Sequence, residues 1–79
     1  MSEIEQIAQI ILKMIIERKN KGLPELSAFH IADELFFRNP KDPIDREKIY
    51  KACDYLISKE YVVERLIDKA LVLKKISAQ

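Results

Sequence analysis

The strongest pattern of apolar and polar positions lies in the second half of the chain. Between residues 49 and 57 apolar residues recur at steps of three and four, which places them on one face of a helix. These residues are Ile49, Ala52, Cys53, Leu56 and Ile57. Asp42 and Pro43 form a helix start signal, because Asp42 can accept hydrogen bonds from the first free N–H groups and Pro43 suits the first helical position. We therefore predict a helix over residues 43–59, with Cys53 packed inside the core.

After this helix the pattern changes to that of strands. The following residues are rich in β-branched side chains, and Asp68 and Lys69 interrupt them. Two such runs joined by a tight turn are typical of a β-hairpin. We predict a hairpin over residues 61–76, joined across Asp68 and Lys69, with Tyr61 contributing to the core.

A long helical pattern opens the chain, over residues 2–21. Ser2 and Glu5 have the spacing of a capping box, and Gly22 is a stop signal. The apolar side chains cover roughly two thirds of the circumference of this helix, which is more than one small domain usually covers and which favours association. We predict a homodimer through this helix, with an interface of Ile4, Ile7, Ile10, Ile11 and Met14. The alternative is that the helix lies in a groove of its own chain, between the other helices and the hairpin.

A second helix is predicted over residues 28–38, with Ser27 as its N-cap. Its apolar face consists of Phe29, Ile31, Ala32, Leu35 and Phe36. The turn before it contains Pro24, and a residue or two near Leu26 could add a short third strand beside the hairpin. His30 lies in the first turn of this helix, where it could contact a phosphate. Because no second ligand or base is nearby, a solvent-facing histidine is the alternative.

Composition limits the function classes. The chain of 79 residues, with 48% hydrophobic and 34% charged residues, predicts a single globular domain over residues 1–79. A net charge of +1 gives no strong attraction to polyanions. The chain has a single cysteine, so it cannot form a disulfide within itself. One cysteine and one histidine are also too few to supply the four ligands of a structural zinc site. There is no nucleophile and base set and no glycine-rich phosphate loop, so we expect no enzyme, no cofactor and no small-molecule ligand.

Targeting signals are equally sparse. No apolar run reaches the length needed to span a bilayer. Glu3 and Glu5 stand where a signal peptide would carry positive charge. We expect a cytoplasmic protein that has no membrane partner.

The predicted order of elements resembles the winged helix-turn-helix family. The likeness is carried by LSAFHIADELFF at residues 26–37 and by KIYKACDYLISKEYVVER at residues 48–65. In the second segment an alanine and a leucine four residues apart precede a polar pair, an aromatic residue and the first strand of the wing. The implied fold class is α+β, with three helices followed by a two-stranded wing, and the likeness extends to small regulators of archaea and their viruses. Glu60 stands where many members have glycine. Either the chain turns there without a glycine-type cap, or Glu60 adopts the strained backbone conformation of that cap.

The resemblance implies binding of double-stranded DNA, with the third helix in the major groove and the wing on the backbone or minor groove. Carried onto this chain, the base-reading residues are Arg46, Glu47, Tyr50 and Lys51, with Asp54 one turn later. Phosphate contacts would come from Lys48, Lys59 and Lys69, and from Ser27 and His30 at the start of the second helix. The expected function is that of a transcriptional regulator, acting as a homodimer on a nearly palindromic site.

Another interpretation of the same surface stays open. Members of the fold also serve as protein-binding modules in larger assemblies, and the near-neutral charge of the chain fits that role. Glu47 and Asp54 lie on the face that would enter the groove, where each carboxylate is repelled by phosphates unless it meets a base amino group. A face of mixed charge is also often simply solvated.

Overall fold

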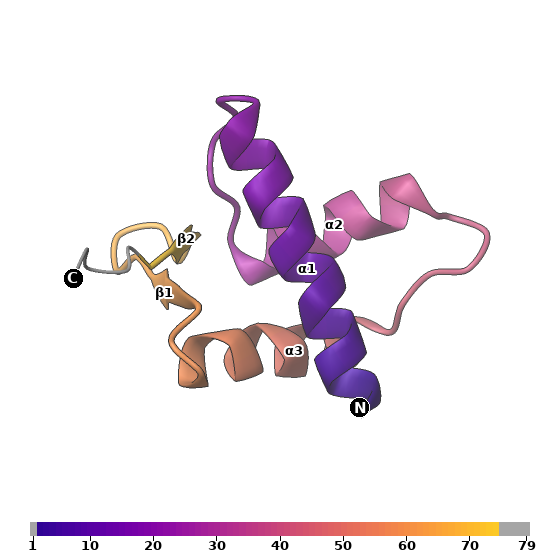
Figure 1. The fold of residues 1–79 in the computed structure, drawn as a ribbon. Coiled ribbons are helices and arrows are strands. Elements are labelled where there is room, and N and C mark those ends of the chain that lie inside the picture. Colours follow the sequence, from indigo (N-terminus) through magenta and orange to yellow (C-terminus); the bar gives the residue numbers. More distant parts are fainter. Residues whose placement is uncertain (1, 75–79) are drawn as a thin grey trace.

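The computed structural model describes residues 2–74, which form three helices followed by a hairpin (Figure 1). The elements are α1 (Glu3–Asn20), α2 (Ala28–Arg38), α3 (Arg46–Ser58), β1 (Val62–Glu64) and β2 (Leu71–Leu73). The predicted α+β fold is confirmed, and the layout is consistent with a winged helix. The predicted hairpin ran to residue 76, and its last two residues lie outside the described part of the chain.

The sheet has two antiparallel strands, with Val63 opposite Val72. The third strand suggested near Leu26 is reduced to a single bridge between Ser27 and Ala70. The Leu71 N–H donates to the Leu26 carbonyl at 2.9 Å, so the hairpin is tied to the segment that leads into α2.

Helix α1 begins and ends where the sequence predicted. Ser2 and Glu5 form both hydrogen bonds of the capping box. At the other end Gly22 adopts a φ of 72°, and the Leu23 N–H donates to the Arg18 carbonyl at 2.9 Å. This is the hydrogen bond of a Schellman cap, and glycine suits its left-handed position. α1 lies across α2 and α3 in Figure 1.

The core lies between α1 and α3 and is closed by one face of α2 and by the hairpin. Its most deeply buried side chains are Ile11, Ile31, Ile49, Leu56, Leu71, Val62 and Cys53. They come from all the helices and both strands, so no element is separable from the core. The inward position predicted for Cys53 is confirmed.

The start of α3 was predicted incorrectly. The helix begins at Arg46, and its N-cap is Asp45, whose carboxylate accepts a hydrogen bond from the Glu47 N–H at 2.8 Å. Asp42 lies in the turn that follows α2. The proline at position 43 disfavours a helical conformation in the residue before it. Ile44 packs against the core, which fixes the incoming chain, and the helix starts only after that anchor.

Glu60, which follows α3, adopts the strained cap conformation, one of the two outcomes expected where this chain has no glycine. Glu60 adopts a φ of 63°. The Tyr61 N–H donates to the Leu56 carbonyl at 3.0 Å and the Glu60 N–H donates to the Ile57 carbonyl at 3.0 Å. These two bonds form a Schellman cap with glutamate at the left-handed position.

The two-residue turn predicted for the hairpin is wrong. The strands end at Glu64 and Leu71, and residues 66–69 form a wider loop. The loop is closed by a hydrogen bond from the Lys69 N–H to the Arg65 carbonyl at 2.8 Å. Lys69 has a φ of 62°, so the lysine occupies a left-handed position for which an Asp-Gly or Asn-Gly turn would have used glycine.

Several aromatic side chains predicted for the core are exposed. Tyr61 is 51% exposed, and Phe29 and Phe36 on α2 are also exposed. The inward face of α2 is set by Ile31, Ala32 and Leu35, and the helical period turns both phenylalanines away from that face.

Within residues 2–74, no helix combines the length and the apolar character required to cross a membrane.

Candidate nucleic-acid interface

The outer face of α3 is the surface that the sequence predicted to read DNA. Glu47, Lys51, Asp54 and Ser58 are exposed along it, and the opposite face of the helix is buried. Tyr50 is half-buried at its edge. The exposed face thus carries two carboxylates and one ammonium group.

Arg46 lies at one border of this face and is engaged within the chain. Its guanidinium pairs with the Asp33 carboxylate on α2 and donates to the Tyr50 hydroxyl at 3.3 Å. It also lies over the Phe29 ring, 5.0 Å from the centroid. The hydrogen bonds to Tyr50 and Asp33 raise the pKa of Arg46. Through these contacts Arg46 connects α2 to α3, although the sequence analysis predicted that it would contact DNA bases.

Lys48 lies at the other border, on the side that faces α1. Its ammonium group is 2.9 Å from the Glu3 carboxylate, and this contact raises the pKa of Lys48. About two turns further along α3, the Tyr55 hydroxyl donates to Glu5 at 3.3 Å, and Lys59, just after the helix, lies over the Tyr55 ring. Of the predicted phosphate contacts, Lys48 is thus paired with α1, and Lys59 is engaged by Tyr55 of its own helix.

Ser27 and His30 are brought together at the start of α2, as the sequence predicted. The Ser27 hydroxyl accepts a hydrogen bond from the His30 N–H at 3.4 Å, and its oxygen is 3.0 Å from His30 Nδ1. Ser27 is also bridged to Ala70, so the start of α2 lies beside Lys69 at the hairpin tip. This places three predicted phosphate contacts, Ser27, His30 and Lys69, in one region.

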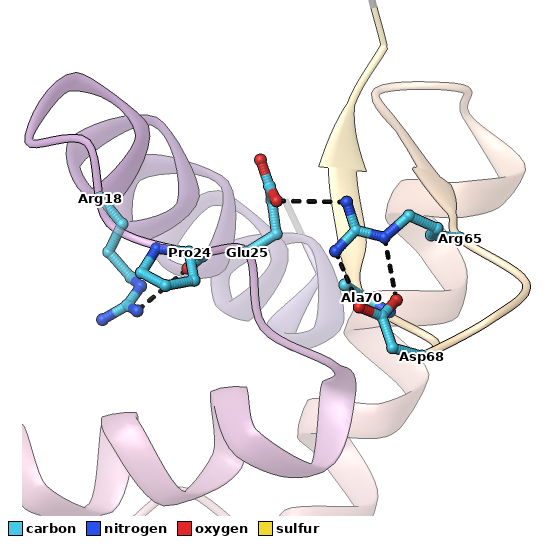
Figure 2. A network of polar contacts seen from close by, with 6 residues as sticks. All are labelled: Arg18, Pro24, Glu25, Arg65, Asp68 and Ala70. Atoms are coloured by element: carbon cyan, nitrogen blue, oxygen red, sulfur yellow. Dashed lines mark hydrogen bonds and ion pairs between the residues drawn. The ribbon is translucent and has the colours of Figure 1, made fainter.

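The hairpin loop is held by an ion-pair network that the sequence did not reveal (Figure 2). The Arg65 guanidinium donates to Asp68 at 3.0 and 2.8 Å and to Glu25 at 3.4 Å. Asp68 also accepts a hydrogen bond from the Ala70 N–H at 3.2 Å. The Arg65 contact lowers the pKa of Asp68 to about 2. Because Arg65 is neutralised on both sides, Lys69 supplies the positive charge at the tip.

The segment before α2 is fixed from the side of α1. The Arg18 guanidinium donates to the Pro24 carbonyl at 3.1 Å, next to Glu25 (Figure 2). The same linker thus joins the end of α1 to the hairpin loop through Glu25 and Arg65.

The hairpin tip is also strongly apolar, which the sequence analysis missed. Leu66 and Ile67 are 86% and 89% exposed, although the sequence assigned both to a strand. The sign that the strand has ended is visible only in the structure, where Arg65 and Asp68 on either side of these residues form an ion pair across the loop. The two adjacent aliphatic side chains form a small apolar patch at the hairpin tip.

The helix predicted as a dimer surface turns most of that surface inward. Ile7, Ile11 and Met14 are buried in the core of the same chain, so they cannot face a second copy. Ile4 is partly buried and packs against the same core, and Ile10 remains 48% exposed. The burial of these residues fits the alternative prediction, in which the helix lies in a groove of its own chain. The sequence pattern shows how much of the circumference of α1 is apolar. It does not show which part of that apolar surface α3 and the hairpin bury.

Candidate chemistry elsewhere is limited. In the described part of the chain, no group of three or more His, Cys, Asp and Glu side chains is arranged to hold a metal ion. Burial raises the pKa of the Cys53 thiol to about 12, which keeps it protonated.

Comparisons with known proteins were made at three levels. Family models, curated proteins and solved structures all gave no match to this chain.

Proposed function

We propose that this protein binds double-stranded DNA through the outer face of α3, with the hairpin as a second contact. The observation that carries the proposal is the arrangement around α3. Three other elements, α1, α2 and β1, pack on this helix, yet Glu47, Lys51 and Asp54 stay exposed along its length. An α-helix presented in this way fits the major groove of B-DNA, whose width admits a helix.

The base-reading residues are Lys51, Glu47 and Asp54. A lysine can donate to the O6 and N7 atoms of guanine, and a carboxylate can accept from the amino group of cytosine. Arg46 and Lys48 act indirectly, since their ion pairs with Asp33 and Glu3 fix α3 against α2 and α1. This division of roles assigns sequence reading to the few side chains that are exposed.

Phosphate contacts come from Lys69 at the hairpin tip and from Ser27 and His30 at the start of α2. Hydroxyl groups and helix N-termini are common phosphate donors. Because few cations are available, affinity should depend only moderately on salt, with a log–log slope of about −2 for two neutralised phosphates. The biological role we propose is transcriptional regulation inside the cell, in the cytoplasm or in a host cell.

The test is selection from a random-sequence duplex pool, followed by binding measurements at two salt concentrations. Lys51→Ala should lower affinity for the selected sequence by about tenfold and relax preference at one position, since one good base contact contributes about 1–3 kcal/mol. Lys69→Ala should weaken binding to all sequences alike and reduce the salt slope by about one. Lys13→Ala, an exposed lysine on α1, is the control with the same change of charge and should bind as the parent does. The proposal fails if the pool shows no enrichment and no binding even at low salt.

A second candidate function is binding of a protein partner. Leu66 and Ile67 favour it, because two exposed aliphatic side chains at a hairpin tip suit an apolar pocket better than a phosphate backbone. The acidic residues on α3 favour it as well. Failure of the DNA selection, together with loss of a partner on Leu66→Ser, would support this candidate.

A further inference from the structure

Helix α1 carries a line of side chains that its own chain covers only in part. Glu5, Leu12 and Lys19 are spaced by seven residues, so about two helical turns separate each from the next and all three lie along one line of the helix. We call it the Leu12 line. It follows the border between the buried and the exposed side of α1. Ile16 lies one turn beyond Leu12, on the exposed side of this line, and is 42% exposed.

A groove opens beside the N-terminal half of the Leu12 line. Its volume is about 240 Å³, and Leu12 on α1, Tyr55 on α3 and Tyr61 before β1 are among the residues that line it. Ala8 lies at its floor and is 1% exposed, whereas Tyr61 is 51% exposed. Pockets for small molecules usually measure about 300–1,000 Å³, so this groove suits a single apolar side chain better than a ligand. Glu5 is the one charged residue that lines it.

The Glu5 carboxylate is available to a cation at this groove. Its two oxygens accept hydrogen bonds from the Ser2 N–H at 3.0 Å and from the Tyr55 hydroxyl at 3.3 Å. An ionised carboxylate has about four acceptor positions, so both oxygens can accept more. The hydrogen bonds from Ser2 lower the pKa of Glu5, which keeps the carboxylate ionised at neutral pH. At the other end of the Leu12 line, Lys19 is exposed and takes part in none of the ion pairs within residues 2–74.

We propose that α1 packs antiparallel against α1 of a second copy of this chain, about a two-fold axis at Leu12. Leu12 is seven residues from both Glu5 and Lys19. The axis therefore sets Glu5 opposite Lys19 of the partner subunit, and the symmetry repeats this ion pair. Leu12 meets Leu12 of the partner subunit at the axis. A two-fold interface of this type uses one self-complementary surface.

The same register directs Ile16 of the partner subunit into the groove. Ile16 lies four residues after Leu12 and Ala8 lies four residues before it, so the partner's Ile16 lies over the floor at Ala8. Its contacts are with the walls, which include the exposed part of Tyr61. A large side chain set against a small one lets two helices pack closely.

The symmetry of these features is the reason for assigning the surface to a second copy. The groove and the protruding Ile16, like the two opposite charges, lie at equal distances on either side of Leu12. A shift of three residues would set the partner's Ile16 opposite Glu5 and the partner's Lys19 opposite Ser2, which loses both matches. The sequence also predicted a dimer through α1, but through side chains that are mostly buried in the core. The inference is independent of what α3 binds.

Sedimentation equilibrium of the full chain tests the proposal. The parent should form dimers, and Ile16→Lys should raise the dimer dissociation constant by about tenfold or more, because it would bury an unpaired ammonium group in each groove. Ile10→Lys is the matched control, since Ile10 is 48% exposed and lies about 120° around the helix from Ile16. It should leave the dissociation constant unchanged, and circular dichroism should show native helix content in both variants.

Zero-length cross-linking gives a positive signal that misfolding cannot imitate. A carbodiimide joins a carboxylate to an amine only where the two groups touch. In a mixture of isotope-labelled and unlabelled chains, Glu5 of one chain should be linked to Lys19 of the other. Within one helix the two residues are about 21 Å apart, too far for this bond. The proposal is overturned by a parent that stays monomeric at several hundred micromolar, by dissociation through Ile10→Lys but not Ile16→Lys, or by the absence of the mixed cross-link.

Discussion

At the scale of single residues, two residues other than glycine adopt backbone conformations that favour glycine. Glu60 and Lys69 have φ values of 63° and 62°. For residues with a Cβ atom the left-handed region is unfavourable. Both residues occupy positions where the chain reverses, after α3 and at the hairpin tip. The single glycine of the chain, Gly22, is used for the third such position, at the end of α1.

Replacing Glu60 with glycine should stabilise the protein. The change removes the strain of the left-handed conformation and outweighs the added entropy of the unfolded chain. The exposed ion pair with Lys74 is also lost, but surface pairs contribute little. We expect Tm to rise by roughly 3–6 °C in thermal unfolding followed by circular dichroism.

The neighbouring residue provides the control for this prediction. Lys59 has a φ of −86°, in the right-handed region, so Lys59→Gly removes no strain and should lower Tm. If both glycine variants move Tm in the same direction, backbone strain at Glu60 is not the cause.

At the scale of elements, the position of the α3 N-cap has a direct test. Asp45 accepts the hydrogen bond from the Glu47 N–H, whereas Asp42 lies in the preceding turn. Asp45→Ala should lower the free energy of unfolding by about 1 kcal/mol, the usual contribution of an N-cap. Asp42→Ala should change it by less than about 0.5 kcal/mol, as exposed substitutions do. Urea unfolding of the two variants distinguishes the two possible starts, and a larger loss for Asp42→Ala would contradict the structure.

The elements that the sequence predicted well are those specified by neighbouring residues. The capping box of Ser2 and Glu5, the stop at Gly22 and the N-cap at Ser27 all depend on contacts within a few positions of the chain. The start of α3 depends instead on where Ile44 meets the core, which is a contact between distant segments. A local start signal at position 42 therefore preceded the true start.

In the candidate site, too, the features set by nearby residues were predicted, and those set by contacts between distant segments were not. That Glu47, Lys51 and Asp54 share an exposed face of α3 follows from the helical period. That Arg46 is engaged by Asp33 does not, because the contact depends on the angle between α2 and α3. The apolar loop was missed for a related reason. Leu66 and Ile67 continue a strand-like pattern, and only the ion pair between Arg65 and Asp68 shows that the strand has already ended.

At the scale of the whole molecule, stability depends on a small core to which every element contributes. A domain of 79 residues is expected to have a free energy of unfolding of about 4–12 kcal/mol. One well-chosen core substitution can therefore remove a large part of it. α1 is the element where this matters most for function, since it packs on the inner side of α3 and fixes the exposed face.

Two neighbouring isoleucines on α1 separate the role of this helix in the core from a role at its surface. Ile11 is fully buried and Ile10 is about half exposed. Ile11→Ala should lower the free energy of unfolding by about 2–5 kcal/mol, because it removes buried methylene groups and leaves a cavity. Tm should fall by roughly 10–30 °C in a domain of this size. Ile10→Ala should cost less than about 1 kcal/mol, because about half of Ile10 is in water in the folded state as well. Thermal unfolding at two protein concentrations decides the matter. If Ile10→Ala lowers Tm as much as Ile11→Ala, and more so at high concentration, the Ile10 side of α1 is buried against a second copy.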